Sequence, residues 1–69
     1  MVELRDASGS LICKGDASTG LVEHIYKRCK TQTHLAIGGY IIIERDGIAT
    51  KITRISTLHF QIERYALVA

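Results

Sequence analysis

The sequence contains no proline, no tryptophan and no asparagine, and it has a single phenylalanine. Without proline the chain has no linker of the stiff kind that separates domains. No apolar run approaches the ~18 residues that a membrane-spanning helix needs, so we expect no membrane partner. The opening MVELRDASGS carries acidic residues where a secretory signal would be apolar. These absences predict one small domain over residues 1–69 of a cytoplasmic protein.

Cysteine is also scarce. The two cysteines, Cys13 and Cys29, are too few for a disulfide framework, and we interpret them as reduced, buried, small hydrophobic residues. A zinc site would have to combine them with His24 and His34, but the sequence has no C-x-x-C or H-x-x-x-H pair at the tight spacing that structural zinc sites use. We therefore expect no metal and no cofactor.

The overall composition is that of a globular protein with a mild excess of positive charge. Hydrophobic residues make up 46% and charged residues 23% of the 69 positions, which argues against disorder. The net charge of +2 permits a nucleic acid or another anionic surface as partner but does not require one. A chain of this length buries only roughly 60% of its unfolded surface, so its stability is marginal.

The segment VELRDASGSLICK predicts a β-hairpin. A two-residue turn at Ser8-Gly9 places Leu4 opposite Cys13, which pairs two apolar side chains. The same register places Glu3 opposite Lys14, which pairs opposite charges.

The segment LVEHIYKRCK predicts an amphipathic helix after a break at GDASTG. Its apolar residues share one helical stripe: Leu21, Val22, Ile25, Tyr26 and Cys29. Asp16 or Ser18 would cap its first turn, although Gly20 within that turn costs about 1 kcal/mol relative to alanine. The alternative makes Gly20 to Lys27 another strand and the whole protein all-β.

The second half of the chain predicts antiparallel strands. TQTHLAI alternates as a strand does, and Gly38-Gly39 turns the chain into GGYIIIERDGIATKI. A type I′ turn at Asp46-Gly47 would place Ile41 opposite Ile52 and Ile43 opposite Thr50, which defines an isoleucine-rich core face.

The last strand, LHFQIERY, is placed by burial. A three-residue loop from Ile55 to Thr57 sets Ile52 opposite Phe60 and Thr50 opposite Ile62, and it gathers the large apolar residues on one side. The opposite, open face of the meander would carry Tyr40, Ile42, Glu44, Lys51, Thr53, His59, Gln61, Glu63 and Tyr65.

Together these segments predict an α+β fold. It consists of an N-terminal β-hairpin, one amphipathic helix, and a C-terminal antiparallel β-meander whose isoleucine face packs on the helix. The alternative is an all-β small barrel or sandwich.

No residue set in the sequence predicts catalysis. The serines Ser8, Ser10, Ser18 and Ser56 lie at or near expected turns, and none stands in a nucleophile elbow or beside an obvious base. We therefore expect a protein that is not an enzyme and has no catalytic residues.

Two sets of residues are candidates for binding. Lys27, Arg28 and Lys30 lie together near the end of the expected helix, where they would complement the helix dipole or neutralise phosphates. Tyr40, Lys51 and Tyr65 share the open sheet face, which resembles in kind the aromatic and cationic surfaces on which single-stranded bases stack.

The function that follows is a non-catalytic binding or interaction module with an unidentified macromolecular partner. The alternative is a nucleic-acid-binding protein that uses the basic helix end and the tyrosine/lysine sheet face. A second copy of the chain is a further candidate partner, since Tyr40, Ile42 and Ile55 could be buried in a homodimer and Leu67 and Val68 could extend an edge strand.

Overall fold

The protein consists of seven β-strands in the part of the chain that its computed structural model describes, residues 1–5, 9, 11–45 and 47–66. The side chain of Tyr26 is not described. The strands are β1 (Val2–Arg5), β2 (Leu11–Asp16), β3 (Leu21–Tyr26), β4 (Cys29–His34), β5 (Tyr40–Arg45), β6 (Ile48–Arg54) and β7 (Phe60–Ala66). No helix long and apolar enough to span a bilayer occurs among these described residues.

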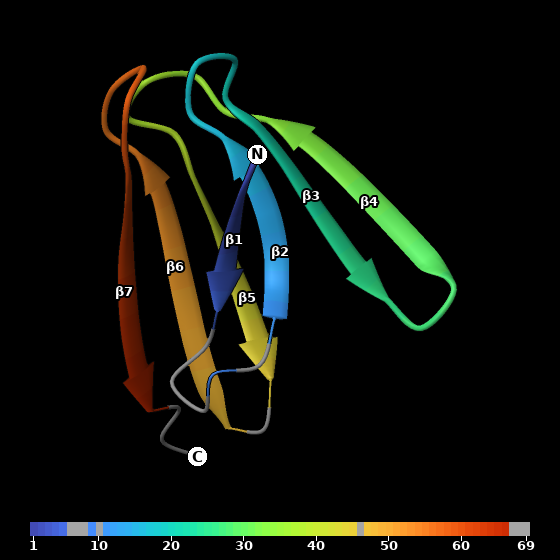
Figure 1. Ribbon diagram of the computed structural model, residues 1–69. Helices are drawn as coiled ribbons and strands as arrows, with labels where there is room; N and C mark the ends of the chain where they lie inside the picture. The colour runs from blue at the N-terminus through green and yellow to red at the C-terminus, as the bar shows by residue number, and fades with distance from the viewer. Residues whose placement is uncertain (6–8, 10, 46, 67–69) are drawn as a thin grey trace.

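The strands form two antiparallel sheets. The first sheet has the order β1-β2-β3-β4 and the second has the order β5-β6-β7. Figure 1 shows β1 and β2 in front of β5 and β6, while β3 and β4 extend to one side. The prediction of an α+β fold is therefore wrong, and the all-β alternative describes the architecture.

The predicted helix is a β-hairpin. Residues 21–26 and 29–34 form β3 and β4, joined by a tight turn in which Lys27 has a φ of 55°. The apolar stripe of the helical reading came from residues that lie side by side in the sequence, such as Leu21 and Val22, and in a strand these point to opposite faces. Pairing with β2 decides the outcome, because it buries Val22 opposite Gly15 and sets Glu23 opposite Lys14.

The N-terminal hairpin has the predicted register. Leu4 lies opposite Cys13 and Glu3 opposite Lys14, as expected, while Ser8 falls outside the described residues. The pairing shifts after Leu4, so that Ile12 is an extra residue on β2. Such a bulge lets consecutive side chains turn inward, and Ile12 and Cys13 are both buried.

The β5–β6 hairpin also has the predicted register. Ile41 lies opposite Ile52 and Ile43 opposite Thr50. Gly47 has a φ of 76°, the conformation that a type I′ turn needs, and Asp46 is outside the described residues.

The predicted register of the last strand is wrong. Ile52 lies opposite Ile62 rather than Phe60, and Thr50 lies opposite Arg64 rather than Ile62. The connection is longer than three residues because the hydroxyl of Ser56 accepts hydrogen bonds from the amides of Leu58 and His59. A shift of two residues leaves every side chain on its predicted face, because the period of a strand is two.

The core lies between the two sheets. The first sheet and the β4–β5 connection contribute its buried members Leu4, Ile12, Cys13, Val22 and Leu35, and the second sheet contributes Ile52 with Ile41, Ile43, Phe60 and Ile62 packed against it. The isoleucine face of the second sheet is therefore the buried face, as predicted. The first sheet covers it, whereas the sequence analysis predicted that a helix would. Phe60 rests on Gly15, where a Cβ atom would lie 2.7 Å from its ring.

Candidate nucleic-acid interface

Lysine and arginine side chains gather at one end of the molecule, which we call the basic end. The odd-numbered strands run toward this end and the even-numbered strands start from it (Figure 1). Six of the nine lysines and arginines lie at or near it: Arg5, Lys27, Arg28, Lys30, Arg45 and Arg64.

Carboxylates at the basic end offset most of its positive charge. Glu44 is close to the end of β5, and Asp6 and Asp46, whose positions are not described, follow Arg5 and Arg45 directly in the sequence. Glu3 and Glu23 also belong to this end, because they pair with Arg5 and Lys30, each at 3.1 Å. Six cations against these five carboxylates leave +1 at the basic end. The rest of the chain carries three cations and two carboxylates, which gives +1 and accounts for the total of +2. The net charge is therefore divided evenly, and the local excess of cations lies on the β3–β4 hairpin, which carries three cations and one carboxylate.

The most exposed part of the basic end is the tip of the β3–β4 hairpin. In the described part of the chain, β3 pairs with β2 only as far as His24, and residues 25–30 pair only with each other. We call residues 25–30 the arm. Figure 1 shows the hairpin diverging from β2 toward its tip. Ile25 remains 51% exposed opposite Lys30, and an isolated two-stranded ribbon is only marginally stable in water, so the arm is built at a cost in stability.

The hairpin that carries the arm has a net positive charge. Its only carboxylate, Glu23, accepts hydrogen bonds from Gln32 and Lys30, each 3.1 Å long. These bonds, that of Gln32 first, lower the pKa of the Glu23 carboxyl. Glu23 therefore stays ionised and partly neutralises Lys30, and three cations against one carboxylate leave the hairpin at +2.

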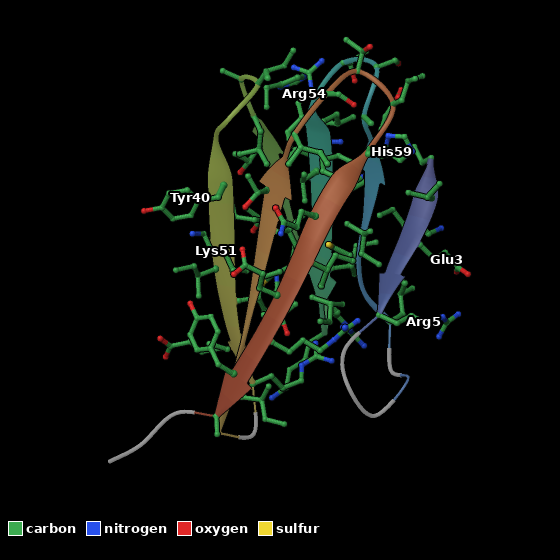
Figure 2. All side chains as sticks on the ribbon, turned by 90° about the vertical axis from the view of Figure 1, so that its left-hand side faces the viewer. Glu3, Arg5, Tyr40, Lys51, Arg54 and His59 are labelled. Atoms are coloured by element: carbon green, nitrogen blue, oxygen red, sulfur yellow. The ribbon has the colours of Figure 1, made fainter. Side chains whose placement is uncertain are left out.

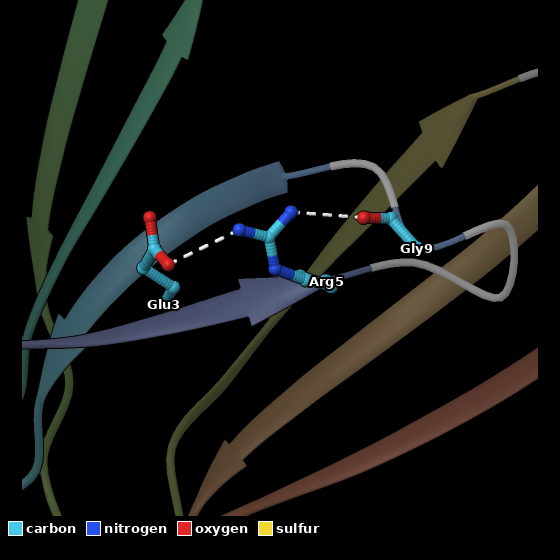
Figure 3. Close-up of polar contacts among 3 residues, drawn as sticks. All are labelled: Glu3, Arg5 and Gly9. Atoms are coloured by element: carbon cyan, nitrogen blue, oxygen red, sulfur yellow. Dashed lines mark hydrogen bonds and ion pairs between the residues drawn. The ribbon is translucent and has the colours of Figure 1, made fainter.

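Arg5 adds an oriented guanidinium at the end of β1. Figure 3 shows it between the carboxylate of Glu3, at 3.1 Å, and the carbonyl oxygen of Gly9, at 2.9 Å. Arg64 of the second sheet donates a hydrogen bond to the backbone carbonyl oxygen of Arg5, so the side chain of Arg64 reaches the end of β1 in the first sheet. The side chain of Arg5 is about half exposed and is accessible to an anion.

The tyrosine/lysine face is a separate surface. Figure 2 shows Tyr40 and Lys51 projecting from the second sheet, on the side away from the first sheet. The Lys51 ammonium lies 4.4 Å from the centroid of the Tyr40 ring, a cation–π contact that covers one face of the ring. Tyr65 lies on the same outer face, opposite Ala49.

The six predicted contact residues therefore divide into two groups. Lys27, Arg28 and Lys30 lie together at the arm, on a hairpin turn rather than at a helix end. Tyr40 and Lys51 contact each other on the outer face of the second sheet. Tyr65 lies on the same outer face, whereas its neighbour Arg64 lies on the inner face of β7. The sequence analysis missed Arg5, Arg45 and Arg64, whose common signal is that each comes at or near the end of an odd-numbered strand.

The opposite end of the molecule carries an apolar groove of about 410 Å³ between β1 and the β6–β7 connection. Met1, Val2 and Leu58 line it and are largely exposed. Ser18 also lines it, and its hydroxyl donates a 2.6 Å hydrogen bond to Asp16, which lowers the pKa of that carboxyl. The serine is thus part of a turn in which a carboxylate, rather than an imidazole, accepts the hydrogen bond from its hydroxyl. The groove is suited to apolar contact.

The metal-ligand candidates do not come together. The structure contains no group of three or more His, Cys, Asp or Glu side chains that could hold a metal ion, within the ranges it describes. Cys13 is buried in the core, whereas Cys29, predicted to be buried, is exposed on the arm.

The two thiols differ in reactivity as a result. Burial raises the pKa of the Cys13 thiol to about 11, so at pH 8 only about one molecule in a thousand carries the reactive thiolate there. We expect a thiol reagent at pH 8 to modify Cys29 rapidly and Cys13 only as the protein unfolds. Mass spectrometry of the time course measures this, and equal rates at both thiols in the native protein would contradict the core placement of Cys13.

Comparison with protein-family models, with curated proteins and with solved structures gave no match to this chain.

Proposed function

We propose that the protein is a non-catalytic binding module of the cytoplasm, and that its partner is a nucleic acid held at the basic end. The observation that carries this proposal is the net charge of +2 on the β3–β4 hairpin, whose three cations lie on or beside a turn that leaves the body of the fold. Clustered lysine and arginine side chains attract the phosphate backbone and release its counterions.

Two further observations support the proposal. Both cysteines are free, which suits a reducing compartment. The tight turn of the arm places the side chains of Lys27 and Arg28 at the outermost point of the hairpin, where a backbone as long as a nucleic acid can reach them without a concave site.

The test is the salt dependence of binding to random-sequence oligonucleotides. We expect measurable binding at 50 mM salt and a slope of log K against log salt of roughly −2 to −4, because each neutralised phosphate contributes about −0.9 on a duplex. Replacing both cations of the turn, as Lys27→Asn with Arg28→Gln, should reduce the slope by about 2. Asparagine tolerates the positive φ of position 27, so the turn is retained.

Matched controls separate this function from protein binding at the groove. Lys14→Gln removes one cation from the middle of β2 and should change affinity less than Arg28→Gln, which removes one from the tip. Leu58→Asn alters the groove at a residue that is 78% exposed and should leave oligonucleotide binding unchanged.

A flat response to salt, or no binding at 50 mM, would rule the proposed function out. If the protein sediments as a dimer that Leu58→Asn dissociates, binding to a second copy through the groove becomes the better assignment.

A further inference from the structure

We infer that the nucleic acid is a duplex and that the arm enters its major groove. This inference rests on the proposed function and names the form of the partner. It follows from the dimensions of the arm and from the position of its cations. It also follows from where the exposed tyrosines lie, because binding of a single strand would need aromatic faces beside the cations.

The width of the arm matches the major groove. Two paired strands lie about 4.8 Å apart, and with side chains on both faces the ribbon is roughly 10 Å across. The major groove of B-form DNA is about 12 Å wide and admits a two-stranded ribbon, whereas the minor groove is about 6 Å wide and does not without deformation.

The length of the unsupported part of the arm also matches. β3 loses its β2 partner after His24, and the two residues from there to the turn, Ile25 and Tyr26, advance the chain by about 7 Å. The major groove is about 8.5 Å deep. Because the turn and the long side chains of Lys27 and Arg28 extend beyond these strand residues, the arm can reach the floor of the groove before the body of the first sheet meets the sugar–phosphate backbone.

The side chains are arranged for this geometry. Lys27 and Arg28 occupy the tip, where they would meet acceptor groups on base edges, and arginine pairs best with guanine there. Ile25, exposed behind the tip, would meet thymine methyl groups. Arg5 and Arg64 lie on the body at the same end, bridging the two sheets, where they would contact the phosphates that border the groove.

A single strand is less well matched. Sequence-tolerant binding of single strands relies on exposed aromatic faces beside a basic groove. Lys51 covers a face of the Tyr40 ring, and Tyr65 lies on the outer face of β7 while Arg64 lies on its inner face. Tyr65 is 45% exposed at the basic end, but it lies on the face of the second sheet that points away from the first sheet, which carries the arm.

The experiment measures binding of the full chain to a fluorescent 20-base-pair duplex at 50 mM salt, in competition with two groove ligands. Methyl green, which occupies the major groove, should weaken binding at least about tenfold, and netropsin, which occupies the minor groove, should change it less than twofold. The single-stranded form of the same sequence should bind at least about tenfold more weakly. Arg28→Gln should reduce duplex affinity about fivefold or more, in line with the loss of one base contact, against less than twofold for Lys14→Gln.

The outcomes separate the inference from the function on which it rests. Displacement by netropsin but not by methyl green, or equal affinity for the single strand, would overturn duplex binding through the major groove and leave nucleic-acid binding intact. Absence of binding to every oligonucleotide would overturn both. Equal binding to vesicles containing phosphatidylserine would also overturn both, because it would show attraction to any anionic surface.

Discussion

Substituting Gly20 with alanine is expected to destabilise the fold by at least about 3 kcal/mol. Gly20 has a φ of 83°, and a Cβ atom there would fall on the carbonyl oxygen of Leu35 and lie 2.9 Å from Nη1 of Arg54. Backbone hydrogen bonds hold it in place, since its amide donates to Asp16 and its carbonyl accepts from Leu35, both at 2.8 Å. The chain cannot move away without breaking this contact between the β2–β3 turn and the β4–β5 connection.

A second glycine provides the matched control. Gly38 has a similar φ, 89°, but open space surrounds the position of its Cβ. Gly38→Ala should therefore cost only the backbone strain, about 1–2 kcal/mol. Urea unfolding of the two variants measures the difference, and equal losses would show that the close approach of Gly20 to Leu35 does not exist in solution.

Substituting Arg54 with methionine is expected to cost about 3 kcal/mol and to lower Tm by roughly 10–20 °C. Arg54 is 9% exposed, and its guanidinium donates to the carbonyl oxygens of Ala17 at 2.9 Å, Ser18 at 3.1 Å and Leu35 at 2.9 Å. Methionine fills similar space but leaves these acceptors without a donor. Thermal unfolding followed by circular dichroism measures the loss.

Exposure distinguishes this arginine from the others. Arg5 also makes two side-chain contacts, with Glu3 and Gly9, but both are exposed, and exposed pairs contribute little. Arg5→Met should therefore change the unfolding free energy by less than about 0.5 kcal/mol. Arg54→Lys should be intermediate, because an ammonium cannot reach all three acceptors. If Arg54→Met lowers the unfolding free energy no more than Arg5→Met does, this result would contradict the hydrogen-bond network that joins the β2–β3 turn to the β4–β5 connection.

The hairpins were predictable because their turns and pairings are encoded locally. Gly47 fixes the β5–β6 register, and the Leu4/Cys13 and Glu3/Lys14 pairs fix that of β1 and β2. Burial alone predicted which side chains of β7 face the core. The register of β7 was not predictable, because it depends on the length of the connection from β6. Hydrogen bonds from the amides of Leu58 and His59 to the Ser56 hydroxyl stabilise a longer connection, and the hydrophobic pattern does not reveal them.

The predicted helix was the main error, because tertiary structure decides the conformation of this segment. Leu21, Val22 and Ile25 fit a helical stripe as well as a strand, and the choice depended on whether β2 offered a free edge beside them. The Lys27 turn gives no sequence signal, because lysine is an unusual residue at a positive φ. Gly20 was the residue that pointed to the correct alternative.

The candidate site was partly predictable for the same reasons. Lys27, Arg28 and Lys30 are neighbours in sequence, so they were identified whatever the secondary structure. Arg5 and Arg64 are far apart in the chain and come together only because antiparallel strands return to the same end. Tyr40 and Lys51 were correctly placed on one face but belong to a different surface from the arm.

The central claim is that the basic end, with the arm at its tip, is the binding surface. Titration of the ¹⁵N-labelled protein with a 20-base-pair duplex, followed by amide chemical shifts, tests it most directly. We predict shifts concentrated at residues 25–30 and at Arg5, Arg45 and Arg64, with the groove residues Leu58 and Phe60 unaffected. Shifts confined to the groove end or to the Tyr40 face, or no shifts at all, would contradict the claim.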